Sequence, residues 1–539
     1  MTRTESPLFY TAHDGKVHHP LGAGSYLYRK GITLPELHLL GLIPNSKTDS
    51  ELHSKTDDTL IIHIGAQPNN SPHAGTLTVF SLAFILGRAM RRTYREYFAS
   101  KNTPRDLRVV VQLDLVDTAP DNAASRVVDG IAYQRSHRST DAMARFLPDY
   151  KQVLKDLAAF VKHEVEYVTE TQETLMRMPS TPAAFQLILS DRERVAMDLS
   201  PSNERLGLRC ACPVCGYADK HGIQNEYLVD NDGNPSGVTF HCHDPAHAPY
   251  TVSLADPEGV AKLEANTPLR NLMRTLVYMH DTVLSLTPND QGRIARRVHM
   301  RVTGADYAGG YQENTLWHQL LLLLLPSAQA LPSQIVVTSQ FNPPTIADKA
   351  FSAGAGSACA SAIHSHQEPR AISHTKLSAD LLTALHPPVI AYAPVVTDWA
   401  GSKLSKSLYV ADGAYSYMMK EKGYLLSFAR MKEEGRDHHI LFREVERWVY
   451  DPKQLQRNWS IEYFHLVFEA EAHRLKEAVG STNADADRAA ESNVGRTERT
   501  ATLKNSTPGR DAEDRNGHKT HANWNGNGQG KSEDEQDEV

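Results

Sequence analysis

Two short apolar runs on either side of one long amphipathic segment constrain the fold of this chain most strongly. Residues 59–66, TLIIHIGA, and residues 107–117, LRVVVQLDLVD, are typical of buried strands, and residues 77–98 have the length and pattern of a helix. A strand, a helix and a second strand in this order predict an α/β fold with a doubly wound parallel sheet, which binds ligands beyond the carboxyl ends of its strands. Further strands are expected at residues 333–341 and 388–396.

The chain divides into segments of different composition. From about Gly480 onward large apolar residues are almost absent, so the tail cannot bury enough surface to offset the entropy of ordering and is predicted to be disordered. The expected organisation is a Rossmann-like catalytic core in two halves, separated by a cysteine-rich insertion and followed by a short helical region and the tail: 1–195 and 296–412 for the core, 196–295 for the insertion, 413–479 for the helical region and 480–539 for the tail.

The overall charge and the apolar runs exclude some classes of protein. A net charge of −7 excludes a generally basic nucleic-acid coat, although a local basic face is compatible with it. The first twenty residues lack the basic and apolar stretches of a signal peptide, and the leucine run from Leu320 ends at Pro326. A cytoplasmic protein without a membrane span is expected.

A cluster of cysteines indicates a metal site in a reducing compartment. Cys212 and Cys215 form a Cys-x-x-Cys-Gly knuckle of the kind found in zinc ribbons, and Cys242 with His247 can complete a tetrahedral site. A set rich in thiolates predicts a closed, structural Zn²⁺ site, because a catalytic zinc keeps an open position. Two nearby residues compete with the second pair of ligands: Cys210 and His243.

The stretch HIGAQPNNSPHAGTL, residues 63–77, contains two histidines that are each followed two positions later by glycine. His63 falls inside the predicted strand and is expected in or beside the core. His73 follows a Pro-Asn-Asn-Ser-Pro loop and precedes the predicted helix, where backbone N–H groups favour anions. His73 is therefore the better candidate for a phosphate ligand.

The loop PNNSPHAGT resembles the first signature of class I aminoacyl-tRNA synthetases, and AGSKLSKSLYV resembles their second, Lys-Met-Ser-Lys-Ser. The resemblance implies that His73 and Thr76 contact ATP phosphates and that Gly75 lets adenine approach the backbone. Lys403 and Lys406 would neutralise the charge on a pyrophosphate leaving group. The resemblance covers roughly residues 55–410.

A third segment, VTGADYAGG at 302–310, is similar to the substrate-pocket motif of class I lysyl-type synthetases, with alanine and tyrosine in place of the family's lysine and histidine. It implies that Gly65, Asp306 and Tyr307 bind substrate, with Asp306 meeting a cationic side chain. These synthetases carry a similar cysteine-rich insertion, which implies a module facing the tRNA acceptor stem.

The part of the chain after the second signature is too short for the usual anticodon-binding domain. Only residues 408–479 lie between Ser407 and the tail, so we expect the chain to bind the acceptor arm of tRNA without reading the anticodon. A class I core of this kind resembles the cyclodipeptide synthases, above all the arginine-containing enzymes of fungi, although the bacterial enzymes lack both signatures and the cysteines. By analogy with the bacterial enzymes Ser71 would be the acyl-accepting nucleophile; the alternative is that Ser71 or Asn70 caps the helix.

Three functions therefore remain open at the level of sequence. The first is a tRNA-dependent cyclodipeptide synthase that joins arginine or another cationic amino acid to a second amino acid taken from charged tRNAs. The second is an ATP-dependent lysyl-like synthetase or an amino-acid-activating paralogue, the only case that needs ATP. The third is a non-catalytic tRNA-binding protein. The expected basic surface combines the first long helix with the second signature: Arg88, Arg91, Arg92, Arg95, Lys403 and Lys406.

Overall fold

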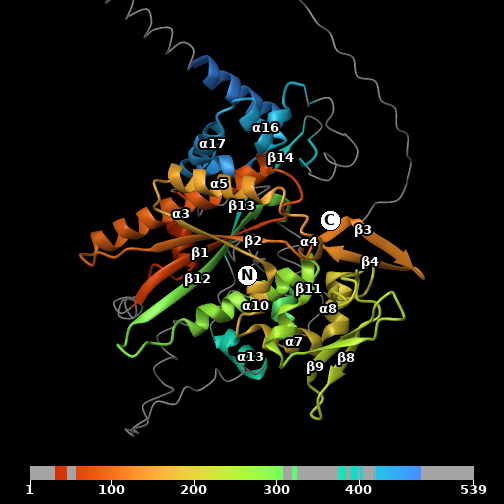
Figure 1. Ribbon diagram of the computed structural model, residues 1–539. Helices are drawn as coiled ribbons and strands as arrows, with labels where there is room; N and C mark the ends of the chain where they lie inside the picture. The colour runs from red at the N-terminus through yellow and green to blue at the C-terminus, as the bar shows by residue number, and fades with distance from the viewer. Residues whose placement is uncertain are drawn as a thin grey trace, which may run out of the picture. The chain divides into compact units, whose positions relative to one another are not determined.

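A five-stranded parallel sheet forms the centre of the fold, in the order β13-β12-β1-β2-β5 (Figure 1). The computed structural model describes residues 31–44, 56–307, 318–324, 374–383, 389–398, 401–404, 418 and 420–474. The predicted parallel α/β sheet is confirmed, whereas the strand expected at 333–341 lies outside the described residues. The strands of the sheet are β1 Thr56–Ala66, β2 Arg108–Leu115, β5 Glu166–Glu170, β12 Ile294–Gly304 and β13 Val389–Ala393.

The strand order places the first strand of the chain at the middle of the sheet. On one side β1 pairs with β2, which pairs with β5; on the other side β1 pairs with β12, which pairs with β13. The connections after β1 and β12 therefore lead away from each other. In open α/β sheets this point of reversal, at the carboxyl ends of the strands, is where ligands bind.

The two faces of the sheet differ in polarity because successive strand residues point to opposite faces. On one face Leu60, Ile62 and Ile64 of β1 are fully buried in an apolar core that includes α3, α5 and α17. On the other face β1 presents His63, beside Asp114 of β2, toward α10. The expectation of apolar strands thus holds for one face only, because α10 supplies polar partners for the other. The helices named are α3 Ala74–Ser100, α5 Leu147–Phe160, α10 Thr267–Leu284 and α17 His439–Tyr450.

The long helix α3 confirms the prediction for residues 77–98 and extends it at both ends. Gly87 lies in its middle, where a Cβ atom would lie 2.9 Å from Val109 and 3.1 Å from Ile62. The absence of a side chain there lets the helix approach the sheet closely. No helix among the described residues is long and apolar enough to cross a membrane.

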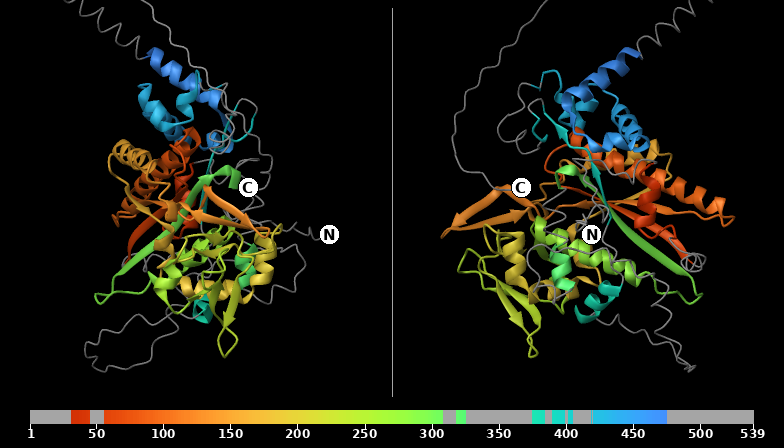
Figure 2. Two further views of the ribbon diagram at one scale, coloured as in Figure 1. Left: turned by 45° about the vertical axis from the view of Figure 1, so that its right-hand side comes forward. Right: turned by 180° about the vertical axis from the view of Figure 1, so that it is seen from behind.

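The segment between β5 and β12 builds a second hydrophobic core, separate from that of the sheet (Figure 2). Its centre is formed by α7 and α10, and two later helices, α11 His318–Leu324 and α13 His374–Thr383, also contribute to it. Small antiparallel sheets flank the loops that contain Cys212, Cys215 and Cys242, and Cys210 is the last residue of β6. The other elements between β2 and α10 are β3 Pro120–Val128, β4 Ile131–Ser136, α4 His137–Thr140, α6 Gln172–Met176, α7 Thr181–Ser190, α8 Arg192–Leu199, β6 Leu208–Cys210, β7 Ala218–Asp219, β8 Glu226–Val229, β9 Pro235–Phe240, β10 Tyr250–Ser253, α9 Pro257–Ala261 and β11 Leu263–Ala265.

The described part of the C-terminal region is mostly helical, as the sequence indicates, and packs on α3 through α17. Trp448 of α17 stacks on Trp459, with ring centroids 5.2 Å apart. A short parallel pairing of β14 with β15 joins this region to the end of the sheet. The remaining elements are α1 Thr33–Leu39, η2 Ala305–Tyr307, β14 Val396–Thr397, η5 Gly423–Leu425, α16 Phe428–Glu433, η6 Pro452–Gln456 and β15 Trp459–Ser460, and residues 461–474 are also helical.

Three of the four arginines expected to form a basic surface on α3 are ion-paired, whereas Arg92 is exposed and its guanidinium lies 3.5 Å from the hydroxyl of Tyr450. Arg88 is buried against Glu446, and Arg91 and Arg95 both bind Asp106, at 2.6 Å each. Because a helix rises about 1.5 Å per residue, Arg95 lies roughly 30 Å along α3 from its first turn, at the end of the sheet opposite the signature loops. The ion-paired arginines are Arg88, Arg91 and Arg95, and α3 carries Arg95 away from Lys403.

Candidate functional site

Residues from both signatures meet at the carboxyl ends of β1 and β12. A Cβ atom on Gly75, in the first turn of α3, would lie 3.7 Å from the Cβ of Val396. The carbonyl of Val396 in turn accepts a hydrogen bond from the amide of Leu404, 2.8 Å away. The first helical turn and the start of the second signature loop are therefore neighbours. Lys406 lies outside the described residues.

His73, not Ser71 or Asn70, caps the N-terminus of α3. Its Nδ1 accepts hydrogen bonds from the amides of Gly75 and Thr76, at 3.0 and 3.4 Å. His63, in contrast, is buried within β1, as the sequence indicates. His73 is therefore fixed at the helix terminus, where the backbone favours an anion.

Ser71 is buried between the signature loop and the C-terminal region. Only 4% of its surface is exposed. Its hydroxyl donates to Oδ2 of Asp149, 2.6 Å away, and accepts from the amide of Ala429 at 3.0 Å. Lys432 binds the other oxygen of Asp149 at 3.0 Å. The serine thus joins three segments of the chain, and its neighbours leave little room for an acyl group.

Asp306 has a cationic partner within the chain. It follows β12, and its carboxylate forms an ion pair with Lys403 of the second signature. The ammonium of Lys403 also lies 5.5 Å from the centroid of the Tyr307 ring. The three predicted residues therefore lie together, and a cationic substrate at Asp306 would compete with Lys403.

The space next to Gly65 is open on the polar face of the sheet. Gly65 is exposed, and a Cβ atom built on it would meet no atom of the described residues within 4 Å. Its register partner on β2 is Asp114, whose side chain accepts a hydrogen bond from Gln112 at 2.8 Å. The open space is compatible with the prediction that Gly65 binds substrate. Asp114, in contrast, belongs to none of the sequence motifs.

A chain of buried polar groups crosses three strands beneath this position. Nδ1 of His63 lies 3.2 Å from Asp114, and Nε2 of His63 lies 2.8 Å from Nδ1 of His299 on β12. Nε2 of His299 in turn lies 2.9 Å from Asp281 of α10. The Tyr278 ring stacks on both histidines, at 4.1 and 4.9 Å. Burial, together with the neighbouring His63 and Arg297, lowers the pKa of His299 to about 4, against the attraction of Asp281.

The lowered pKa of His299 makes stability depend on pH in a defined window. The unfolded histidine binds a proton near pH 6.5 but the folded one only near pH 4, so the unfolded state binds more protons between these values. The free energy of unfolding should be unaffected above pH 6.5 and should fall by up to roughly 3 kcal/mol as pH decreases to 4. Urea unfolding at several pH values would measure this change. His299→Gln should flatten the pH dependence, and an equal slope in both proteins would contradict the prediction.

The four predicted metal ligands converge in the insertion. The ligand atoms of Cys212, Cys215, Cys242 and His247 all lie within 4.8 Å of one another, so this cluster could hold a metal ion such as zinc. Sγ of Cys215 lies 3.4 Å from Sγ of Cys242, which is 3.2 Å from Nδ1 of His247. The knuckle and the second pair come from separate loops, and tetrahedral zinc binds this mixture of sulfur and nitrogen donors.

The two competing ligands lie outside this set. Burial raises the pKa of Cys210 to about 12, which favours the thiol over the thiolate that a metal requires. Nε2 of His243 lies 3.1 Å from the guanidinium of Arg126, although its other nitrogen is 3.5 Å from Cys242. His247, and not His243, therefore belongs to the converging set, while His243 contacts Arg126 of β3.

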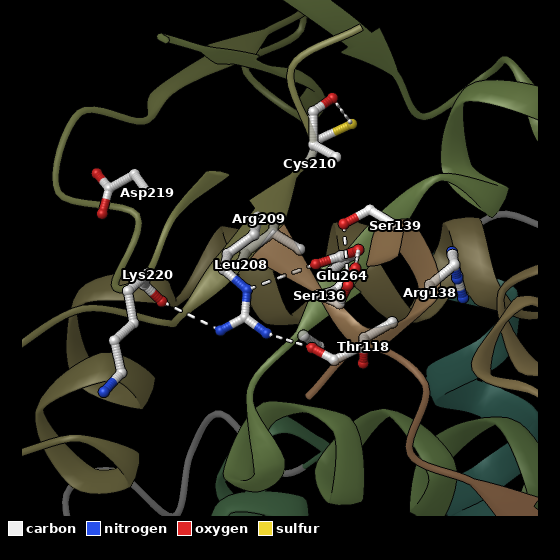
Figure 3. A network of polar contacts seen from close by, with 12 residues as sticks. Thr118, Ser136, Arg138, Ser139, Leu208, Arg209, Cys210, Asp219, Lys220 and Glu264 are labelled. Atoms are coloured by element: carbon white, nitrogen blue, oxygen red, sulfur yellow. Dashed lines mark hydrogen bonds and ion pairs between the residues drawn. The ribbon is translucent and has the colours of Figure 1, made fainter. Parts of the chain in front are cut away.

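A buried ion pair connects the insertion to the carboxyl end of β2 (Figure 3). The guanidinium of Arg209 donates to the carbonyls of Thr118 and Lys220, at 2.9 and 3.2 Å, and lies 3.8 Å from Glu264. Glu264 also accepts a hydrogen bond from Ser136 at 2.6 Å. Both charged side chains are 4% exposed, so their partners hold the metal-binding module against the edge of the sheet.

A second serine has a histidine and an aspartate beside it. The Ser180 hydroxyl lies 2.6 Å from Nδ1 of His280, whose Nε2 lies 2.9 Å from Asp380. Ser180 and His280 are 2% and 0% exposed, while the Asp380 side chain is 22% exposed. A nucleophilic serine needs the reverse, an accessible hydroxyl with a buried carboxylate behind it. We therefore interpret this group as a polar link between α7, α10 and α13.

Comparisons with known proteins add no relative. Neither the models of known protein families nor the curated proteins contain a match to this chain. Any assignment of function therefore depends on the residues at the carboxyl edge of the sheet and in the metal-binding cluster.

Proposed function

We propose that this chain is a tRNA-dependent cyclodipeptide synthase that joins arginine, or another cationic amino acid, to a second amino acid as a diketopiperazine. The observation that supports it best is the meeting of His73, Gly75 and Lys403 at the point where the strand order reverses. That order is the one found in Rossmann-like cores, which bind adenosine-containing ligands there. The terminal adenosine of a charged tRNA is such a ligand.

The proposed reaction consists of two acyl transfers. The α-amine of one aminoacyl group attacks the ester carbonyl of the other, an amide forms, and a tRNA hydroxyl leaves. A second attack closes the ring and releases the other tRNA. The cationic Lys403, with Lys406 beyond it, would stabilise negative charge at the carbonyl or on neighbouring phosphates, and His73 and Thr76 would hold the terminal nucleotide.

Ser71 can act as an acyl acceptor in this scheme only if the C-terminal region moves. Asp149 is close enough to take the hydroxyl proton, at 2.6 Å, but the amide of Ala429 occupies the opposite side of the oxygen. Direct transfer between two bound aminoacyl groups requires no such movement. Product formation by Ser71→Ala, measured together with its stability, separates the two routes.

An ATP-dependent synthetase is the second candidate, because both resembling signatures are ATP-binding elements and their described residues are neighbours. It differs in one measurable property, since a synthetase activates a free amino acid without charged tRNA. Exchange of pyrophosphate into ATP driven by free arginine or lysine would favour this candidate. Absence of both reactions would favour a non-catalytic tRNA-binding protein.

The proposed product can be tested with arginyl-tRNA, a mixture of other charged tRNAs and the purified chain in the absence of ATP. Mass spectrometry should detect an arginine-containing diketopiperazine. Asp306→Asn should abolish use of arginine without unfolding the protein. The guanidinium of arginine requires a carboxylate partner, and it would compete with Lys403 for the carboxylate of Asp306. The matched control is Asp57→Asn, an exposed aspartate at the opposite end of β1 that binds Arg293. Unchanged arginine use by Asp306→Asn would remove Asp306 from the site.

Binding of the acceptor arm gives an independent prediction. A minihelix that contains only the acceptor arm should bind within a few-fold of whole tRNA, because the proposed contacts of His73, Thr76 and Lys403 are all with the end of the acceptor arm. Since contacts to phosphates dominate such binding, affinity should fall steeply between 50 and 200 mM salt, as for other nucleic-acid complexes. Filter binding with both RNAs measures this. Much weaker binding of the minihelix would show that contacts outside the acceptor arm contribute.

For the metal-binding cluster we propose one structural Zn²⁺ per chain, held by Cys212, Cys215, Cys242 and His247. The fit rests on the mutual distances and on the three sulfur donors, which leave no open position for catalysis. Because Arg209 and Glu264 connect this module to the carboxyl end of β2, zinc would stabilise the edge of the sheet that carries the site.

A further inference from the structure

Arg274 is a nearly buried cation whose charge the described residues satisfy poorly. Its side chain is 11% exposed, and its nearest carboxylate is Asp114, with 3.8 Å between Nη2 and Oδ2. This distance is too long for a hydrogen bond. Among the described residues its guanidinium makes no hydrogen bond, and its Nε is completely enclosed. Buried charged groups are normally both paired and hydrogen-bonded, so a guanidinium that has an ion pair but no hydrogen bond indicates a missing partner.

The position of Arg274 on α10 directs it toward the polar face of the sheet. Asn271, three residues earlier, accepts a hydrogen bond from Arg301 of β12 at 3.2 Å. Tyr278, four residues later, stacks on His63 of β1. Residues spaced by three and four lie on one face of a helix, so Arg274 faces the sheet between these two contacts. It therefore lies beside Asp114, the register partner of the open position at Gly65.

Asp114 has two supports besides Arg274. It accepts from Gln112 and lies within hydrogen-bond distance of His63, and burial, which would raise its pKa, is outweighed by Arg274 and His63, so that its pKa is well below the usual range. The contacts of His63 and His299 with each other and with the two carboxylates are all short enough for hydrogen bonds. Asp114 is thus an anchored carboxylate that orients the guanidinium.

We propose that Arg274 is a catalytic residue of the carboxyl-edge site, which donates to the acyl carbonyl oxygen of the substrate and stabilises the negative charge that forms when this carbonyl is attacked. Asp114 and His63 are its positioning residues. This inference takes its reaction from the proposed acyl transfer. The observation that Arg274 makes no hydrogen bond among the described residues does not depend on that function. A preorganised cation in a site that excludes water is a strong stabiliser of such an oxyanion.

The kinetic test compares Arg274→Met and Arg274→Lys with Arg270→Met. Arg270 is the matched control, because it is a buried arginine on the same helix whose guanidinium binds the carbonyl of Ala265 and the hydroxyl of Thr267. Arg274→Met should lower kcat for diketopiperazine formation about 100-fold or more with KM nearly unchanged, and Arg274→Lys should retain part of the rate. An effect on KM alone, or a loss of kcat no larger than in Arg270→Met, would overturn the proposal.

A stability measurement keeps the inference testable if no product is found. Arg274→Met removes the cation beside Asp114 but no hydrogen bond among the described residues, so it should lower the unfolding midpoint in urea by less than Arg270→Met does. A decrease in Arg274→Met as large as in Arg270→Met would show a structural role and overturn the proposal. If wild type makes no diketopiperazine but Arg274→Met destabilises the protein less than Arg270→Met does, the proposed function fails while the ligand-binding premise for Arg274 remains supported.

His63→Gln supplies a readout for the positioning residues. The charged groups facing His63 are Asp114 of β2 and, through His299, Asp281 and Arg297, while α10 contributes Arg274 and the Tyr278 ring. Loss of the imidazole should change the pH profile of kcat as well as its maximum, since the contact with His63 is one of the causes that hold the pKa of Asp114 below its usual range. A reduced rate with an unchanged pH profile would assign His63 a structural role only.

Discussion

Replacing Cys215 by serine is expected to abolish binding of the proposed zinc and to lower the free energy of unfolding by several kcal/mol, because binding of a structural metal contributes directly to folding. Cys215 supplies one half of the knuckle, and its sulfur lies 3.4 Å from that of Cys242 in the other half of the cluster. Without a metal these loops would place several thiolates close together. Elemental analysis of the purified protein and urea unfolding monitored by circular dichroism would measure both effects.

Cys210→Ser is the matched control for this experiment. Cys210 is buried two residues before the knuckle but lies outside the set of converging ligands. Its replacement should preserve the metal content and cost only the packing and hydrogen bonding of one thiol. Absence of metal from wild type, or equal metal loss in both variants, would contradict the assignment of the four ligands.

Replacing Glu264 by leucine is expected to cost about 3–5 kcal/mol, the usual penalty for leaving one member of a buried ion pair without its partner. Arg209 would remain 4% exposed and would lose the counter-charge of Glu264, and a guanidinium cannot lose its proton. Arg209→Met should cost less. Burial already raises the pKa of Glu264, so this carboxyl group can accept a proton when its partner is removed.

The double variant Arg209→Met/Glu264→Leu should recover much of the loss, because well-packed apolar residues often replace a buried ion pair without penalty. Urea unfolding of the single and double variants forms a complete thermodynamic cycle. Arg108→Met is a suitable control, since Arg108 forms an exposed pair with Glu166 at 2.6 Å and its loss should change stability little. A double variant less stable than either single variant would contradict the expectation.

The buried ion pair lies between the metal-binding module and the strand that carries Asp114, so these variants should also affect the proposed activity. Arg209 donates to Thr118, which follows β2, and Asp114 lies near the end of the same strand. Loss of the metal or of the pair should therefore lower activity through the position of β2. Addition of zinc to metal-depleted wild type should restore it.

The sequence by itself determined the features that depend on short-range spacing. Apolar runs on either side of a long helical segment are sufficient to predict a parallel sheet, because strands covered by helices on both faces are rich in apolar residues. The spacing of Cys212 and Cys215 similarly predicts a knuckle, since it brings two sulfurs to one tight turn. The position of His73 just before a helix distinguishes it from His63 in the strand. Each of these predictions needs only a few consecutive residues.

Tertiary structure alone decided which distant side chains meet. Asp306 binds Lys403, Ser71 binds Asp149, and Arg274 lies beside Asp114, although no spacing in the sequence relates the members of these pairs. The physical reason is that such contacts depend on how α10 and the C-terminal helices pack on the sheet, and that packing is the sum of many weak interactions along the chain. The polar face of the sheet is the clearest example. Alternate residues of its strands are polar, and they can be buried because α10 supplies their partners.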